Sequence, residues 1–306
     1  MRKINYTFAE SLANNSISRI AGCHSPLSAK LAEEAGFDAV WFSGFEYSTS
    51  MCLPDASILT MSDHLATISS ITRSINIPLL ADCDSGFGDA NNVAFMVKEY
   101  EHAGVSGVCI EDKLFPKLNS FCNEKQELIE IDEFCLKIIA AVEVRRSKEF
   151  MIVARLESLI TGNGVEDAIM RANAYASAGA DVILVHSKAS DTHEIEQFFN
   201  SFDLSTIPTI IIPTTYYKAT IEEIRAISPN IKGVIYANQG IRASIKAIKA
   251  TYTDILSHGT SSSIESSLIS IKEAFKYQRM QEHTQYYDCL KKRLNDMRIK
   301  KHKLYL

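Results

Sequence analysis

Short runs of apolar and β-branched residues alternate along the chain with longer segments whose apolar residues recur at helical spacing. The short runs, typical of buried strands, lie near residues 17–21, 39–42, 77–81, 107–110, 151–155, 182–185, 208–212 and 233–237. The helical segments lie near residues 26–35, 61–74, 90–103, 131–145, 165–178, 191–199, 220–227 and 240–257. Each pair of run and helix takes about 25–40 residues, as βα repeats require. Eight such pairs predict an α/β fold, a closed (β/α)8 barrel, with a doubly wound parallel sheet as the alternative.

Two further helical patterns, near residues 264–280 and 282–300, follow the eighth unit. They cannot belong to the barrel, so we expect them to cap it or to reach a neighbouring subunit. The polar stretch TSSS at residues 260–263 separates them from the barrel. We therefore predict a barrel catalytic domain over residues 1–258 and a C-terminal helical extension with a basic tail over residues 259–306.

Charge and cysteine content limit the partners of the protein. The net charge is −5, but residues 291–303 carry a local charge of +6, which leaves −11 for the rest. We interpret this tail as a solvated helix and expect no nucleic-acid partner, because basic and aromatic residues interleave nowhere else. No apolar run approaches membrane-spanning length, and the N-terminal residues lack the apolar core of a signal peptide. The seven scattered cysteines include no C-x-x-C pair, so we expect a cytoplasmic protein without a disulfide framework.

Polar and ionisable residues follow almost every predicted strand, at the end of the barrel where active sites lie. Charge or imidazole at four of these ends is hard to explain as surface decoration. The strand ends carry Trp41, Ser43 and Gly44, then Asp82 and Asp84, then Glu111, Asp112 and Lys113, then Arg155 and Glu157, then His186 and Lys188, and finally residues 213–215 and 238–239.

The three acids Asp82, Asp84 and Glu111 supply the hard oxygen ligands that Mg²⁺ prefers. Because Mg²⁺ usually keeps several waters, some of these carboxylates are expected to reach the ion only through water. The alternative is that an acid at a strand-to-helix turn caps the next helix. The sequence thus predicts a magnesium site at the barrel mouth, with helix capping left open for Asp84.

The predicted strand order places Arg155 and His186 across the mouth from the acids. A guanidinium forks onto carboxylate or phosphate oxygens, and an imidazole can donate to the same anion. The alternatives are a barrel-end salt bridge for Arg155 and a core histidine for His186. The residue pair 43–44 either presents backbone N–H groups to an oxyanion or simply forms a tight turn. Lys113 and Lys117, beside acids, suggest an anion-binding role rather than a Schiff base.

Several segments resemble the phosphoenolpyruvate mutase and phosphonopyruvate hydrolase branch of the isocitrate lyase superfamily. The most specific is EDKLFPKLNS at residues 111–120, and the others are AGCHSPLSAK at 21–30, AEEAG at 32–36, the Asp82-x-Asp84 segment, VAR at 153–155, VHSK at 185–188 and AN at 237–238. The resemblance covers residues 15–280. Isocitrate lyases carry a KKCGH loop with a catalytic cysteine, which this chain lacks, so carbon–carbon lyase activity of that kind is not expected.

This resemblance implies a Mg²⁺-dependent barrel that assembles as a homotetramer, a dimer of dimers in which a late helix swaps between subunits. It implies that Asp82 ligates the metal directly, and that Asp55, Asp84 and Glu111 hold metal-bound waters. It places Trp41, Ser43, Gly44 and Phe45 around the pyruvyl group of the substrate, with Arg155 and His186 on its anionic ends. Lys117 and Asn119 then lie on a loop that gates the site. The implied catalytic set is Asp55, Lys117, Asn119, Arg155 and His186.

Members of the branch catalyse two different reactions. Mutases interconvert phosphoenolpyruvate and phosphonopyruvate, making a C–P bond, whereas hydrolases let water take the phosphoryl group and release pyruvate and phosphate. Asn119, where the hydrolase has threonine, and PTTYYK at residues 213–218 resemble the mutase. GFEYSTS at 44–50 and PDASILTM at 54–61 resemble the hydrolase, and Gln239 departs from the histidine of both.

The gating loop decides whether water reaches phosphorus, so the sequence favours a mutase, with a hydrolase as the alternative. A non-catalytic scaffold is a remote third interpretation.

Overall fold

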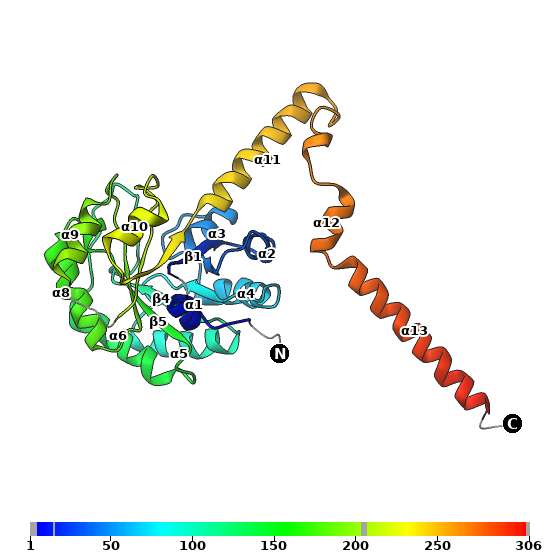
Figure 1. Cartoon of the computed structure of the whole chain (residues 1–306), viewed down its shortest axis with the longest axis horizontal. Helices are drawn as coiled ribbons and strands as arrows, with labels where there is room; N and C mark the ends of the chain where they lie inside the picture. The colour runs from blue at the N-terminus through cyan, green and yellow to red at the C-terminus, as the bar shows by residue number, and fades with distance from the viewer. Residues whose placement is uncertain (1–4, 15, 203–206, 304–306) are drawn as a thin grey trace. The chain divides into compact units, whose positions relative to one another are not determined.

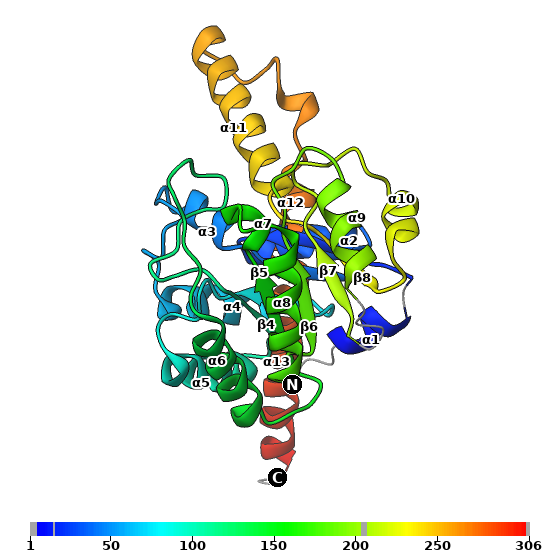
Figure 2. The same ribbon diagram turned by 90° about the vertical axis from the view of Figure 1, so that its left-hand side faces the viewer.

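The computed structural model describes residues 5–14, 16–202 and 207–303, so the first four residues of the N-terminal segment considered above lie outside it. Eight parallel strands form a closed barrel in chain order, in which β8 pairs with β1 (Figures 1 and 2). This confirms the predicted barrel and rules out the doubly wound sheet. The strands are β1 Ser18–Cys23, β2 Ala39–Phe42, β3 Leu79–Asp82, β4 Gly107–Glu111, β5 Met151–Leu156, β6 Val182–Val185, β7 Thr209–Ile211 and β8 Ile231–Tyr236.

A ring of helices, each following a strand, surrounds the barrel (Figures 1 and 2). These are α2 Pro26–Glu34, α4 Met61–Thr72, α5 Ala90–His102, α6 Ile131–Val144, α8 Gly164–Ser177, α9 His193–Ser201 and α10 Ile221–Ile227. The helix after β8, α11 Gln239–His258, is not part of this ring, and most of it belongs to a second compact unit. Three short helices were not predicted, because few residues leave little periodic signal. They are α1 Phe8–Asn14, α3 Gly44–Ser50 and α7 Ser158–Thr161.

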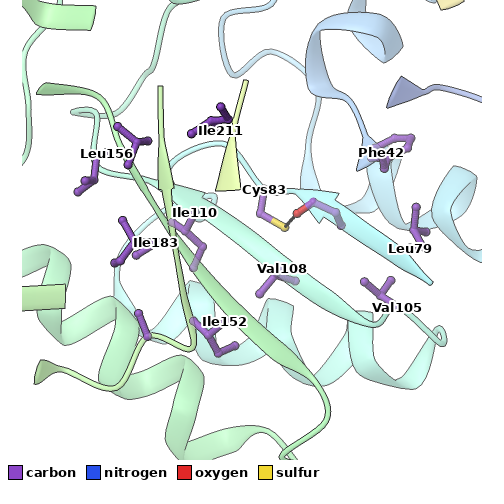
Figure 3. Packing of buried hydrophobic residues seen from close by; sticks show 14 of the residues in the cluster. Phe42, Leu79, Cys83, Val105, Val108, Ile110, Ile152, Leu156, Ile183 and Ile211 are labelled. Atoms are coloured by element: carbon purple, nitrogen blue, oxygen red, sulfur yellow. Dashed lines mark hydrogen bonds between the residues drawn. The ribbon is translucent and has the colours of Figure 1, made fainter. Parts of the chain in front are cut away.

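The core has two layers, because successive side chains of a strand point to opposite faces. Leu80 and Val153 belong to a cluster that also contains Trp41, and their neighbours Leu79 and Ile152 belong to the larger cluster that includes residues of the surrounding helices. Figure 3 shows part of the larger cluster, with side chains from β3, β4, β5 and β6 packed together. This rigid double-layered core holds the carboxyl ends of the strands in fixed positions.

The chain forms two compact units, residues 1–244 and 245–306. The second unit contains most of α11, the short 3₁₀ helix η1 Glu265–Ser267, α12 Ile271–Tyr277 and α13 Met280–Lys303. The helix predicted over residues 264–280 is divided into η1 and α12. The break occurs because Ser270 adopts an extended conformation and caps α12 by accepting from the Glu273 amide at 3.1 Å. The domain boundary after residue 258 coincides with the end of α11 and stays a prediction.

In the part of the chain that the structure describes, no helix is both long enough and apolar enough to cross a membrane. All seven cysteines are free.

Candidate active site

Three buried carboxylates gather at the ends of β3 and β4. Asp82 ends β3, Glu111 ends β4, and Asp84 lies two residues beyond Asp82. Asp84 has a positive φ of 49°, and its amide donates to Asp82 Oδ1 at 3.2 Å while its carbonyl accepts from the Glu111 amide at 2.8 Å. This turn folds the acids against one another, and Asp84 caps no helix, since Asp89 is the N-cap of α5. Burial raises the pKa of all three carboxyl groups.

The charges at the mouth fit a divalent cation. Burial lowers the pKa of His186, so this imidazole is neutral at pH 7. Neither Asp84 Oδ1 nor Glu111 Oε1 accepts a hydrogen bond from the described residues, although Lys117 Nζ lies 3.1 Å from Asp84 Oδ1. Two negative charges thus remain, the charge that Mg²⁺ neutralises, because five carboxylates, all buried except Asp55, face three buried cations. The carboxylates are Asp55, Asp82, Asp84, Glu111 and Glu157, and the cations are Lys113, Lys117 and Arg155.

No group of three acidic, histidine or cysteine side chains in the described ranges converges closely enough to hold an ion on its own. This arrangement suits Mg²⁺, which keeps several of its waters and takes few protein ligands. Asp82 is the best placed direct ligand because it is the one of the three acids that lines the cavity. Asp84 and Glu111 lie beside it, where they would bind water of the ion.

The strand order predicted that Arg155 would lie across the mouth from the acids. It lies beside one of them instead. Its Nη2 is 3.4 Å from Glu111 Oε2, because β4 and β5 pair at Glu111 and Arg155. Nη2 also lies 3.0 Å from His186 Nδ1, so the two predicted anion-binding residues adjoin. His186 Nε2 is buried and has no hydrogen-bond partner among the described residues. It is therefore not a satisfied core histidine.

The loop from β2 into α3 approaches the acids from another side. Ser43 is the N-cap of α3, and its Oγ accepts from the Glu46 amide at 3.2 Å. The Gly44 amide lies 3.4 Å from Asp82 Oδ2. A side chain at residue 44 would place Cβ 3.3 Å from Asp84 Oδ1, so glycine lets this backbone come close. The loop is a helix start rather than a simple tight turn. Its Gly44 amide faces Asp82, whereas the Ser43 amide donates to Cys23 O at 3.0 Å.

A closed loop, residues 112–130, covers the mouth and is called the lid below. Lys117 Nζ lies 2.5 Å from Asp55 Oδ1 on the opposite rim, and Asn119 Nδ2 donates to Asp55 Oδ2 at 2.6 Å. The Lys117 amide also donates to Ser57 Oγ at 3.1 Å. Although burial opposes it, the charge of Lys117 lowers the pKa of Asp55. These contacts hold the lid shut over the acids.

Lys113 does not bind anions at the mouth, contrary to the expectation above. Its side chain is buried, donates to Leu118 O at 3.0 Å and Ser120 Oγ at 2.7 Å, and forms an ion pair with Glu157 at 2.9 Å. Lys113 therefore links residues of the lid to one another and to Glu157.

One cavity of about 520 Å³, including its open mouth, joins most of the predicted residues. Gly44, Asp84 and Glu111 adjoin the cavity but do not line it. Its walls include the predicted residues Trp41, Ser43, Phe45, Asp55, Asp82, Lys117, Asn119, Arg155 and His186. They also include residues that sequence reasoning did not assign to the site, namely Ser120, Phe121, Ile212, Thr214, Ala237 and Asn238.

Two buried glutamates were given no role in the site by the sequence, although Glu157 was noted as a strand-end residue. Glu157 accepts from Arg155 Nε at 2.6 Å and contacts His186 Nδ1 at 2.9 Å. Glu46 contacts His24 Nδ1 at 2.8 Å and accepts from the Ile241 amide at 3.3 Å, which ties α3 to the start of α11. The only signal for Glu157 in the sequence was its position directly after β5; Glu46 had none.

The chain matches the family model described as phosphoenolpyruvate phosphomutase over residues 8–256. It is 41% identical over 275 residues to a phosphonopyruvate hydrolase of Variovorax sp. (strain Pal2), covering 90% of this chain and 94% of that protein. It is 37% identical over 268 residues to a phosphoenolpyruvate phosphomutase of Tetrahymena pyriformis, covering 87% and 88%.

Two solved structures are similar along most of their length. A phosphoenolpyruvate phosphomutase from Streptomyces platensis subsp. rosaceus superposes with a TM-score of 0.89 at 42% identity, covering 92% of this chain and 96% of that one. A phosphonopyruvate hydrolase in complex with oxalate and Mg²⁺ superposes with a TM-score of 0.86 at 39% identity, covering 92% and 97%. The two activities are thus represented at nearly equal similarity.

Proposed function

Because the chain belongs to the phosphoenolpyruvate mutase family of the isocitrate lyase superfamily, we propose that it is a Mg²⁺-dependent phosphoenolpyruvate mutase. In this reaction the phosphoryl group of phosphoenolpyruvate leaves the enol oxygen and joins the methylene carbon, giving phosphonopyruvate. The observation that carries the proposal is the hydrogen bond between Asn119 on the lid and Asp55 on the opposite rim, 2.6 Å long. It closes the lid at the residue where the hydrolase has threonine.

The site suits the charges of this reaction. Phosphoryl transfer passes through a loose state with charge spread over the phosphoryl oxygens, so catalysis is mainly positioning and electrostatic stabilisation. Arg155 and the free Nε2 of His186 are placed to bind an anionic end of the substrate. The Gly44 amide faces Asp82, where the pyruvyl oxygens would lie, and Ser43 lines the cavity beside it. The lid keeps water from the phosphoryl group while it moves between oxygen and carbon.

Mg²⁺ would supply positive charge to the enolate oxygens of the substrate. The similar phosphonopyruvate hydrolase structure is a complex with oxalate and Mg²⁺. In this chain Asp82 would ligate the ion, and Asp55, Asp84 and Glu111 would hold its waters. The two uncompensated negative charges of the cluster support this assignment.

The second candidate function is phosphonopyruvate hydrolysis. The Variovorax hydrolase is slightly more similar to this chain than the Tetrahymena mutase, at 41% against 37% identity. Residues 44–50 and 54–61, which form α3 and part of the opposite rim, also resemble the hydrolase. A non-catalytic scaffold would have no need for a cluster of carboxylates with two uncompensated negative charges under a closed lid.

We expect ³¹P NMR of phosphonopyruvate with the protein and Mg²⁺ to show phosphoenolpyruvate as the first product. Phosphonopyruvate is the informative starting compound because both candidate reactions consume it. Inorganic phosphate as the first product, without phosphoenolpyruvate, would establish the hydrolase instead. If neither product forms and Mg²⁺ with oxalate gives no thermal shift, the scaffold interpretation holds.

We further propose that the protein assembles as a homotetramer, a dimer of dimers in which α11 and the helices after it pack on a neighbouring subunit. Four large apolar side chains spaced along one face of α11 are exposed in the single chain, namely Ile245, Ile248, Tyr252 and Leu256. Sedimentation velocity should give a tetramer for the wild type and smaller species for Leu256→Glu. Ala250→Glu, on the other face of the helix, is the matched control and should remain tetrameric. A monomeric wild type at micromolar concentration contradicts the proposal.

A further inference from the structure

Glu157 is a buried side chain with four polar partners near the cavity, yet it does not line the cavity. It follows β5 directly, and its side chain is fully buried. Two of its partners belong to the anion-binding pair: Arg155 Nε donates to it at 2.6 Å, and His186 Nδ1 lies at 2.9 Å. The other two belong to the lid: Ser120 Oγ donates to it at 2.7 Å, and Lys113 Nζ lies at 2.9 Å.

The lid and the anion-binding pair therefore share one carboxylate. Ser120 Oγ also accepts from Lys113 Nζ at 2.7 Å and from Arg155 Nη2 at 3.2 Å, which makes the network continuous. When the lid opens, Ser120 leaves Glu157, and a fully buried charge loses a hydrogen bond that water cannot easily replace. Glu157 is then held by fewer hydrogen bonds, so it fixes the orientation of Arg155 and His186 less firmly.

We propose that Glu157 is a positioning residue that couples closure of the lid to the orientation of Arg155 and His186. Through this carboxylate, an anion bound by the pair favours the closed lid, and the closed lid favours the binding orientation of the pair. Although burial opposes it, the charges of Arg155 and Lys113 lower the pKa of Glu157 well below its usual range, so the carboxylate is ionised. The inference rests on the proposed function only for the identity of the anion.

The test is limited trypsin digestion at the lid, followed by mass spectrometry. Lys113 and Lys117 are both buried under the closed lid, so cleavage after either residue reports the population of the open state. Glu157→Gln keeps the shape of the side chain but removes its charge. Because a hydrogen bond to a charged group contributes appreciably, we expect cleavage to become about tenfold faster, with and without Mg²⁺ and oxalate. The same variant should raise KM for phosphonopyruvate and lower kcat, whereas a merely structural role would lower only the melting temperature.

Two further variants make the test specific. Ser120→Ala removes one of the two lid contacts of Glu157 and leaves the carboxylate and its ion pair with Lys113 in place, so it should also speed cleavage. The double variant should be cleaved no faster than Glu157→Gln alone, because both changes remove the same interaction. Asp181→Asn is the matched control. Asp181 directly precedes β6, at the other end of the barrel, and accepts from Arg145 and from the Ile152 amide of β5. Its loss should leave lid cleavage unchanged.

Wild-type cleavage rates in Glu157→Gln, or additive effects in the double variant, would overturn the coupling. If Glu157→Gln does not fold, as judged by circular dichroism, a wild-type cleavage rate in Ser120→Ala overturns it instead. Proteolysis needs no turnover, so a wild type that converts neither phosphonopyruvate nor phosphoenolpyruvate would refute the proposed function while leaving the coupling to be decided by these rates.

Discussion

Replacement of Asp82 by alanine is expected to abolish turnover of phosphonopyruvate, with a loss of at least about 1,000-fold in kcat/KM. Asp82 is the acid that both lines the cavity and ends a barrel strand, so it is the proposed direct ligand of Mg²⁺. Without it the remaining acids have too little contact with the ion to hold it against water. Turnover of the variant within tenfold of the wild type would refute the metal assignment.

The stability of this variant separates loss of metal from loss of fold. Burial raises the pKa of Asp82, which means that the charged carboxylate costs folding free energy above its usual pKa. The variant should therefore melt at or above the wild-type temperature when Mg²⁺ is absent. It should lose the stabilisation that Mg²⁺ with oxalate gives to the wild type, as measured by thermal shift.

Asp89→Ala is the matched control for Asp82→Ala. Asp89 lies in the same loop but caps α5 and is exposed, and its carboxylate accepts from the amides of Asn91 and Asn92. Loss of this cap should lower the melting temperature slightly and leave turnover unchanged. A matching loss of activity in the control would show that the loop, rather than the metal, is sensitive to substitution.

The barrel was predictable because its strands are buried on both faces and read as uninterrupted apolar runs. The predicted segments 39–42 and 182–185 coincide with β2 and β6. Where the bounds differ, a local cause is visible. The run 77–81 was placed too early, because Pro78 has no N–H to donate and β3 begins at Leu79.

The candidate site was less completely predictable than the barrel, because several of its contacts join residues that are far apart in the sequence. Asp82 and Arg155 could be placed because each lies at the end of a strand, where the fold alone brings it to the mouth. The bond between Asn119 and Asp55 joins residues 64 positions apart through a loop without regular structure, so no periodicity predicts it. The prediction for Lys113 was wrong for a related reason: although it lies beside acids in the sequence, its side chain turns inward to Glu157, directly after the next strand.

The contact between the lid and the opposite rim joins two segments that give different indications of the reaction. From the sequence alone, we expect Asn119 on the lid to be mutase-like and residues 54–61, on the rim that it contacts, to be hydrolase-like. Both sides meet at Asp55, which accepts from Asn119 and pairs with Lys117. The distinction between the two reactions therefore depends on how firmly this contact excludes water, which no single segment of the chain determines.

Replacement of Asn119 by alanine is expected to lower total turnover of phosphonopyruvate by about 100-fold, because the lid loses its bond to the rim and the substrate loses its fixed position. Water then reaches the phosphoryl group, so inorganic phosphate should rise relative to phosphoenolpyruvate in ³¹P NMR. The melting temperature should stay close to that of the wild type, since Asn119 belongs to the lid and not to the core. Lys125→Ala is the matched control on the same lid: Lys125 is exposed and pairs only with the exposed Glu127, so its loss should change neither rate nor product ratio. Undiminished turnover with an unchanged product ratio in Asn119→Ala would mean that the contact with Asp55 has no part in keeping water out.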